Sequence, residues 1–372
     1  MGVMGQVAPG FERVASAFEQ NFDDGLEHGA AFAVFLGDEC VVDLAGGWRD
    51  KRKTLPWETQ TISAMYSTTK AMMALVVAML VDRGKLAYDQ PVATWWPEFA
   101  AEGKGDFTLA QVLSHQCGIP GFVEPIDKAL WFDPIGLAEA IARMKPMFWP
   151  GEGTGYHPLI PGYVAAELAR RVDGRTIGTI LREEVCGPLG LDYRIGTSVS
   201  EFDRIAEQLK PLDPPQFGER NAVLQAAFLN PWSAPERDGE AWKTHEIPSA
   251  NGIGSAKATA RIMSAYALKG RIGERRLISE DTWRQLVRER VVGKDRVQPG
   301  RIGFAAGLQR NTQESLFGPG PETVGHTGWG GSAAWADPEA GFSACYLMNR
   351  KGTHLFADDR RARLIDAVYA CL

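Results

Sequence analysis

The chain has 372 residues, of which 45% are hydrophobic and 23% charged, and its formal net charge is −6. This is the composition of an ordinary globular protein with material for a substantial core. Charges of both signs are interspersed and no basic stripe or polybasic segment occurs, so the charge pattern argues against nucleic-acid and anionic-membrane partners.

The five cysteines are widely spaced and form no C-x-x-C pair. This spacing argues against a disulfide framework and a zinc site, and we expect neither a metal nor another cofactor. The N-terminal residues lack the pattern of a signal peptide. The longest apolar run, Ala71 to Val81, is too short to span a bilayer. We therefore expect a cytoplasmic protein that does not enter a membrane.

In chain order, the first predicted element is an amphipathic helix, because apolar residues recur at helical spacing over residues 11–26. Two strand-like runs follow, residues 31–36 and 40–44, and the intervening Gly37-Asp38 predicts a β-hairpin. The apolar run at 71–81 predicts a buried helix. Ser67 lies at the start of that helix, and Lys70 follows one turn later on the same face.

The middle and the C-terminal part of the chain differ in pattern. Helices are predicted over 161–172, 176–185 and 256–268, with Pro/Gly-rich connections between them. Short strands are predicted over 303–308, 332–337 and 341–348, and a final helix carries Leu364, Ile365, Val368 and Tyr369 on one face.

These elements predict an α/β fold, an α+β sandwich in which the two ends of the chain form one antiparallel sheet flanked by terminal helices. The middle would be an all-α insertion. We expect residues 1–66 together with 271–372 to form the α/β domain and residues 67–270 a mainly helical domain. The active site is expected in the cleft between them.

Ser67-Thr68-Thr69-Lys70 is the strongest candidate for chemistry. An alcohol beside an amine at the positive end of a helix dipole is a plausible activated nucleophile. A Ser-x-x-Lys pair arises about once by chance in a chain of this length, so by itself it is only a hypothesis. No other serine in the chain has a lysine three residues later.

Three further segments bear on this hypothesis. A Pro/Gly-rich loop delivers Tyr156 just before a predicted helix, and a phenol near a lysine can shuttle protons, although most such tyrosines only pack. The glycine-dense segment 324–332 indicates close backbone approach to a ligand or another strand, or else a bulged strand end. His115 is a candidate base, but its flanking Gly118 and Pro120 favour a structural turn.

Together these segments resemble the serine β-lactamase and penicillin-binding-protein superfamily, in which Ser-x-x-Lys, a tyrosine and a late Thr-Gly pair occur in this order. The resemblance runs from about residue 10 to the C-terminus. It extends to Leu-Ser-His-x-x-Gly-Ile-Pro at 113–120, Cys-Gly-Pro-Leu-Gly-Leu at 186–191 and Ile-Pro-Ser-Ala-Asn-Gly-Ile-Gly-Ser at 247–255. It implies a β-lactamase/transpeptidase-like fold and acyl transfer through a serine ester.

Departures from the superfamily pattern narrow the expected subfamily and make a simple ester a more expected substrate than a β-lactam. Class C β-lactamases carry Tyr-x-Asn where this chain has Pro158 at the third position, and Lys-Thr-Gly where it has His326-Thr327-Gly328. The missing lysine removes the usual anchor for a substrate carboxylate. Trp329-x-Gly331, with His326 in the lysine position, looks like the family VIII carboxylesterases, which hydrolyse short-chain esters.

The resemblance implies Ser67 as nucleophile and Lys70 with Tyr156 as the proton-transfer pair, without deciding which of the two is the base. It also implies an oxyanion hole of the Ser67 and Trp329 N–H groups. His326 is expected to contact a substrate carbonyl or carboxylate, with a structural histidine as the alternative. The further predicted substrate-binding residues are Thr327, Gly328, Trp329, Gly331 and Trp149. Trp131, Phe132, Trp232 and Trp242 could also line an apolar pocket for the acyl or alcohol group, but core packing is the expected role for most of them.

The expected function is hydrolysis of a small-molecule carboxylic ester. Alternatives within the superfamily are a β-lactamase, a D-amino-acid peptidase or amidase, and an acyltransferase using the same residues. A non-catalytic scaffold is disfavoured because Ser67, Lys70 and Tyr156 are all present. The chain has no G-x-S-x-G motif, which argues against an α/β-hydrolase. It has no paired histidines at helical spacing, which argues against a metallohydrolase. The acyl preference and the oligomeric state do not follow from the sequence.

Overall fold

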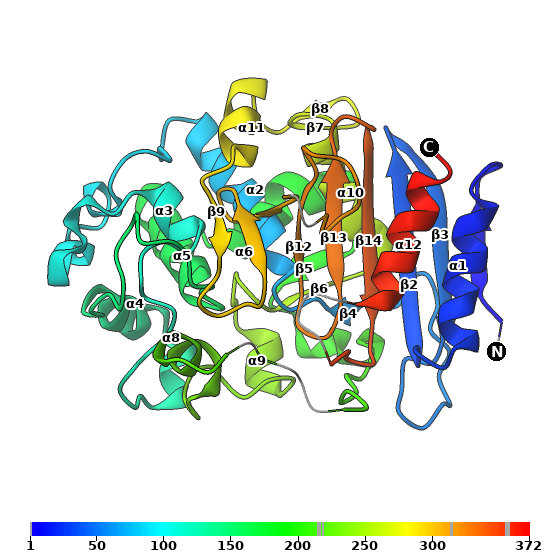
Figure 1. Cartoon of the computed structure of the whole chain (residues 1–372), viewed down its shortest axis with the longest axis horizontal. Coiled ribbons are helices and arrows are strands. Elements are labelled where there is room, and N and C mark those ends of the chain that lie inside the picture. Colours follow the sequence, from blue (N-terminus) through cyan, green and yellow to red (C-terminus); the bar gives the residue numbers. More distant parts are fainter. Residues whose placement is uncertain (1, 214–216, 218, 313–314, 354–357) are drawn as a thin grey trace.

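The computed structural model describes residues 2–213, 217, 219–312, 315–353 and 358–372, and within them one large antiparallel sheet brings the two ends of the chain together (Figure 1). Its nine described strands are, in spatial order, β1 (Met4–Val7), β3 (Glu39–Gly47), β2 (Gly29–Leu36), β14 (Phe342–Met348), β13 (Ala333–Asp337), β12 (Val324–Thr327), β11 (Gln309–Arg310), β10 (Arg301–Phe304) and β9 (Val291–Lys294). The N- and C-terminal parts meet where β2 pairs with β14, Phe32 opposite Tyr346.

Helices cover both faces of this sheet. On one face lie α1 (Glu12–Asp23) and α12 (Asp359–Tyr369), which pack side by side near the two termini (Figure 1). On the other face α10 (Ala256–Ala267) packs against β14, β13 and β2. Alternate strand residues point to opposite faces, so β2, β13 and β14, which pack against α10, are mostly apolar and buried along both faces. The result is a three-layer sandwich of helix, sheet and helix.

The remaining helices form a second region, which extends from the centre of the view to its left side in Figure 1. They are α2 (Thr69–Asp82), α3 (Leu109–Leu113), α4 (Pro134–Ala142), α5 (Ile160–Val172), α6 (Ile177–Leu181), α7 (Gly187–Leu189), α8 (Ala222–Leu224), α9 (Glu240–Thr244) and α11 (Glu280–Val287). Twelve of the fourteen residues of α2 are buried, so this helix is apolar all round and lies in the centre of the protein.

Two small sheets complete the described strands. One has the order β4 (Ser63–Ala64), β6 (Gly252–Gly254) and β5 (Tyr193–Ile195), and the other pairs β7 (Arg271–Ile272) with β8 (Arg275–Arg276). In the first of them, β4 leads directly into the segment that carries Ser67. Its partner β6 follows Ser249 in the chain, so this pairing brings the segment of Ser249 close to that of Ser67.

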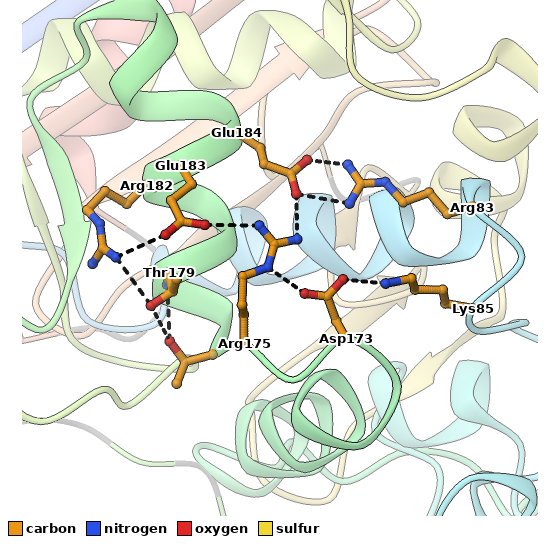
Figure 2. Close-up of polar contacts among 9 residues, drawn as sticks. Arg83, Lys85, Asp173, Arg175, Thr179, Arg182, Glu183 and Glu184 are labelled. Atoms are coloured by element: carbon orange, nitrogen blue, oxygen red, sulfur yellow. Dashed lines mark hydrogen bonds and ion pairs between the residues drawn. The ribbon is translucent and has the colours of Figure 1, made fainter.

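An ion-pair network links Arg83 and Lys85, which follow the end of α2, to residues 173–184 (Figure 2). Arg175 is its centre: the guanidinium bonds Asp173 at 2.5 Å, Glu184 at 2.7 Å and Glu183 at 3.0 Å. The carboxylate of Asp173 also accepts from Lys85 at 2.6 Å. Apart from the buried Asp173, the side chains of the network are partly exposed, so it links segments but adds modest stability.

Most predicted elements are confirmed with shifted ends. The first helix stops at Asp23 because Gly25 adopts a left-handed conformation, with φ of 70°, which leaves Leu26 outside. The strand predicted at 303–308 is wrong in position. The β10 strand ends at Phe304, and Gly307, with φ of 84°, turns the chain toward β11. The edge strand β1 is not predicted from the sequence, because its short run has no apolar alternation.

The fold class and the antiparallel sheet with a helical insertion are confirmed. The division into residues 1–66 with 271–372 and residues 67–270 stays a prediction. The helix α10 precedes the predicted boundary at 270, yet it packs against the large sheet.

Candidate active site

Ser67 sits in the turn that leads into α2. The residue before it, Tyr66, has φ of 48°, a left-handed conformation that side chains other than glycine rarely adopt and that clusters at functional sites. This geometry is held by Thr69, whose hydroxyl donates to the Tyr66 carbonyl at 2.5 Å and accepts from the Gly252 N–H at 2.8 Å. The turn is therefore anchored to β6 as well as to its own helix.

Lys70 lies one turn into α2 and is fully buried. Its Nζ is 3.3 Å from Oγ of Ser67 and donates to the carbonyl oxygens of Pro158 at 2.6 Å and Ser249 at 3.1 Å. Burial lowers the pKa of this amine well below its usual range. Lys70 is thus held against the serine in an environment that favours the neutral amine.

Tyr156 is buried beside the same pair. Its ring centroid lies 5.0 Å from Nζ of Lys70, and its backbone N–H donates to the Asp295 carboxylate at 3.0 Å. Burial raises the pKa of the phenol well above its usual value, while a hydrogen bond with Ser67 acts in the opposite direction. The phenol is therefore protonated at neutral pH, and Tyr156 lines the same cavity as the nucleophile.

The end of β12 approaches the nucleophile's turn very closely. A Cβ on Gly328 would lie 2.2 Å from the Met65 carbonyl oxygen and 2.8 Å from Oγ1 of Thr68, so only glycine fits there. Ser332 strengthens the junction by donating to the same Met65 carbonyl at 2.9 Å. The close backbone approach that the glycine-dense segment predicts is present, and it is made to the segment that carries Ser67.

A small cavity opens on these groups. The volume open to water inside it is about 50 Å³, enough for roughly three to five water molecules. It is lined by Tyr66, Ser67, Tyr156, Pro158, Leu159, Ala227, Phe228, Ser233, Ala234, Pro235, Arg237, Trp242, Ala250, Gln298, Thr327, Gly328 and Trp329. Within the described residues, the backbone N–H groups of Ser67 and Trp329 donate no hydrogen bond. The site thus combines a mainly apolar wall with free donors beside the hydroxyl.

The structure brings together Ser67, Lys70, Tyr156, Thr327, Gly328 and Trp329 of the sequence-predicted site. It places His326 elsewhere: the ring is buried behind Tyr156, with centroids 6.0 Å apart, and Nδ1 donates to the Thr327 carbonyl at 2.7 Å. Burial lowers the pKa of His326 well below its usual value. This placement supports the structural alternative rather than direct contact with substrate.

Trp149 and Gly331 also lie outside the cavity lining. Trp149 is 43% exposed and packs edge-on against Phe107, with ring centroids 5.5 Å apart. Gly331 has φ of 120° and faces Asp358 and Arg360 of the C-terminal segment. The loop that carries Trp149 also carries Tyr156, but the Trp149 side chain does not line the cavity. The structure therefore gives no support to the predicted roles of Trp149 and Gly331 in substrate binding.

His115 occupies the structural position that its turn context favours. It is buried with φ of 63°, its ring lies 4.7 Å from that of Tyr156, and Nδ1 accepts the His157 N–H at 3.2 Å. His157 in turn accepts from the Ile119 N–H at 2.9 Å. Burial is the main cause that lowers the pKa of His157 to about 3. These neutral histidines support Tyr156 from behind.

Sequence reasoning missed several residues of the site. Ser249 supplies a carbonyl to Lys70, and Arg237 lines the cavity. Trp242, a pocket candidate for which core packing is the expected role, lines it as well. Asp295 holds the Tyr156 backbone and caps its own turn by accepting from the Val297 and Gln298 N–H groups, both at 2.8 Å. Asp followed by a Pro-Gly turn was a usable signal for this Asx-type turn. No local sequence pattern indicates that Ser249 or Arg237 belongs to the site.

Among the residues that the structure describes, no helix combines the length and apolarity needed to cross a bilayer.

Comparison with known proteins identifies the relatives of this chain. Residues 18–368 match the family model described as beta-lactamase. The esterase/beta-lactamase LipL of Mycobacterium tuberculosis is 33% identical over 366 residues, covering 94% of this chain and 83% of LipL. Two solved structures cover both chains completely. A penicillin-binding protein homologue from Caulobacter crescentus is 48% identical with a TM-score of 0.98, and a family VIII carboxylesterase is 40% identical with a TM-score of 0.93.

Proposed function

The chain belongs to the β-lactamase family of serine hydrolases, and on that premise we propose that it hydrolyses short carboxylic esters through an acyl-enzyme on Ser67. The observation that carries the proposal is the buried amine of Lys70 3.3 Å from Oγ of Ser67, at a small apolar cavity. Esterase names among the relatives add support, while the penicillin-binding homologue leaves the substrate open.

Lys70 is the general base in this proposal. A neutral amine has two N–H donors and one lone pair, and two carbonyls, of Pro158 and Ser249, take the two donors. The lone pair is then left for the third neighbour, the Ser67 hydroxyl. The lowered pKa of Lys70 and the raised pKa of Tyr156 favour the same assignment, because a protonated phenol cannot accept the serine proton.

The N–H groups of Ser67 and Trp329 form the oxyanion hole. Both residues line the cavity, and neither N–H has a hydrogen-bond acceptor among the described residues. Free donors fixed in a water-poor site stabilise the charge that develops on the carbonyl oxygen. Removing one such donor typically costs about 100-fold or more in rate.

Tyr156 is the general acid. In acylation the Ser67 proton passes to Lys70, Oγ bonds the carbonyl carbon, and the departing alcohol takes the Tyr156 proton. In deacylation a water gives its proton to the Tyr156 phenolate and attacks the ester carbon. Oγ of Ser67 then leaves and recovers its proton from Lys70. The transient ammonium and phenolate are close enough to stabilise one another, since Nζ lies 5.0 Å from the phenol ring.

The test is covalent labelling combined with turnover. The wild-type protein is treated with a fluorophosphonate and, separately, with p-nitrophenyl butyrate, and its intact mass and the release of nitrophenol are measured. We expect a single adduct on Ser67 and none in Ser67→Ala. Ser233→Ala is the matched control for the label. Ser233 lines the same cavity, but its hydroxyl donates to the Ala226 carbonyl at 2.8 Å, so the adduct should remain.

The alternatives are separated in the same series. A chromogenic cephalosporin and a D-alanyl amide are assayed beside the ester, and products are analysed with an added alcohol. Dominant cephalosporin or amide turnover would replace the esterase proposal with a β-lactamase or an amidase. Transfer of the acyl group to the alcohol would indicate an acyltransferase. Full ester turnover by Ser67→Ala would refute the nucleophile itself.

A further inference from the structure

One charged side chain stands at the wall of the cavity. Among the described residues that line it, Arg237 alone carries a formal charge at neutral pH, and none is acidic. Arginine stays protonated throughout the physiological range. Its planar guanidinium can form directional, bidentate hydrogen bonds with an anion.

Arg237 is positioned beside the proposed oxyanion hole. Its guanidinium carbon lies over the Trp329 ring, 4.9 Å from the ring centroid, at the indole of the residue whose N–H is assigned to the oxyanion hole. A stacked guanidinium keeps its N–H groups free at its edge, where they match the two oxygens of a carboxylate. Phe217 and Phe228 pack on the same indole, with ring centroids 5.9 Å and 5.8 Å away.

The acidic neighbour of Arg237 is already engaged. Asp238, with φ of 67°, accepts from the Tyr66 hydroxyl at 2.9 Å through one oxygen and from Nζ of Lys351 at 3.2 Å through the other. No hydrogen bond or ion pair joins the Arg237 guanidinium to a described residue. Arg237, Lys351 and Asp238 together leave one net positive charge at the rim. Asp238 thus fixes the loop that carries Arg237, while the guanidinium itself remains available.

We propose that Arg237 binds a carboxylate of the substrate, so that the ester cleaved at this site is an anionic one. The inference rests on the proposed ester hydrolysis at Ser67 and adds the class of substrate to it. Arg237 would supply, from the helical region, the carboxylate anchor that a lysine in the position of His326 would otherwise provide. Asp238 is a positioning residue in this scheme.

The experiment compares matched anionic and neutral esters. One pair, 4-acetoxybenzoate and its methyl ester, carries the carboxylate on the alcohol side. The other, mono-4-nitrophenyl adipate and 4-nitrophenyl hexanoate, carries it on the acyl side. For each pair the ratio of kcat/KM, anionic over neutral, is measured in the wild type, Arg237→Gln and Arg237→Lys. The ratio is the readout because loss of the stacked side chain will also alter turnover of the neutral ester.

We expect the wild type to prefer the anionic member of at least one pair by about 10-fold, as a charged hydrogen-bonded contact would give. Arg237→Gln should abolish that preference, and Arg237→Lys, which keeps the charge but loses the planar fork, should retain part of it. Arg143→Gln is the matched control: Arg143 is exposed, pairs with Glu139 at 3.8 Å and lies outside the cavity lining, so its ratio should equal that of the wild type. Thermal melting shows that each variant is folded.

A binding measurement separates failure of this inference from failure of the proposed function. Calorimetry measures 4-acetamidobenzoate and its methyl ester binding to Ser67→Ala, with and without Arg237→Gln, where no turnover can occur. Preference for the anion that depends on Arg237 supports the carboxylate site even if no ester is hydrolysed. Ester turnover with no anion preference in either pair, or a preference that survives Arg237→Gln, overturns it and leaves Arg237 as a side chain that merely packs on Trp329.

Discussion

Replacing Lys70 with methionine isolates the role of the buried amine. Methionine keeps an unbranched apolar chain of similar length, so the buried space that the Lys70 side chain occupies stays filled. The substitution removes the lone pair that faces Ser67 and the two N–H donors that satisfy the Pro158 and Ser249 carbonyls. Its effects on rate and on stability therefore have separate origins and can be measured separately.

The expected loss of rate is large. A positioned general base contributes about 10²–10⁴-fold, so kcat/KM for p-nitrophenyl butyrate should fall by that factor. The effect on stability is smaller. Each unpaired carbonyl costs about 1–3 kcal/mol, but the variant no longer has to bury an amine whose charged form is disfavoured. These contributions offset one another, and we expect a net change of at most about 3 kcal/mol at pH 7.

The pH dependence provides a second measure. The folded-state pKa of Lys70 is well below the unfolded value of about 10.4, so between the two the unfolded chain binds one more proton. Wild-type stability should therefore gain from this residue as pH rises through that window, by up to about 1.4 kcal/mol per pH unit. Lys70→Met should lack this contribution. In the wild type, activity should decline as pH falls through the lowered pKa, because protonation removes the base.

Lys104 is the matched control. It is also fully buried, but its Nζ donates to three carbonyls, of Ala101, Ala142 and Met144, at 2.7 to 2.9 Å. All three donors of an ammonium are thus used, and burial lowers the pKa of Lys104 only to about 8. Lys104→Met should destabilise the protein at least as much as Lys70→Met while the folded enzyme retains its kcat.

The assay is steady-state ester hydrolysis from pH 5 to 9 combined with urea denaturation of each variant. The reasoning is refuted if Lys70→Met retains more than about a tenth of the wild-type kcat/KM, a loss smaller than a general base produces. It is equally refuted if the loss matches that of Lys104→Met, because the effect would then be a general consequence of emptying a buried lysine site.

Three further outcomes follow from the site. Tyr156→Phe should lower kcat by about 10²-fold or more with little change in KM, measured with the same ester, because the proton donor to the alcohol is lost. Gly328→Ala should lose both activity and several degrees of melting temperature, because the added Cβ would lie 2.2 Å from the Met65 carbonyl oxygen. The pKa of His157 is lowered to about 3, so stability should fall between pH 6.5 and 3 by up to about 1.4 kcal/mol per unit, and denaturation of His157→Gln should show a smaller slope.

Each of these has a counterpart elsewhere in the chain. Tyr163 is also a buried phenol, whose hydroxyl donates to the Trp131 carbonyl at 2.9 Å, so Tyr163→Phe should spare kcat. A Cβ on Gly293 would meet nothing within 4 Å, and Gly293→Ala should be neutral. His245→Gln, at an exposed histidine, should have the same urea stability at pH 7 as the wild type. A counterpart that behaves like its partner variant contradicts the corresponding prediction.

The sequence by itself determined the elements and the reacting groups. Residues 71–81 are apolar without a break, and a helix buried on all sides needs such a run, so the place of α2 and the spacing of Ser67 and Lys70 followed directly. Apolar runs on either side of Gly37-Asp38 likewise determined the β2–β3 hairpin. These are local properties of 3.6- and 2-residue periods, which need no knowledge of the rest of the chain.

Tertiary structure alone decided how those groups are tuned and what surrounds them. Burial lowers the pKa of Lys70, and its amine is held by the carbonyls of Pro158 and Ser249, which lie 88 and 179 residues away in the chain. The same packing turned Trp149 outward and brought Trp242 and Arg237 to the cavity. Desolvation and the neighbours of a side chain depend on segments far apart in sequence, so no local pattern could encode them.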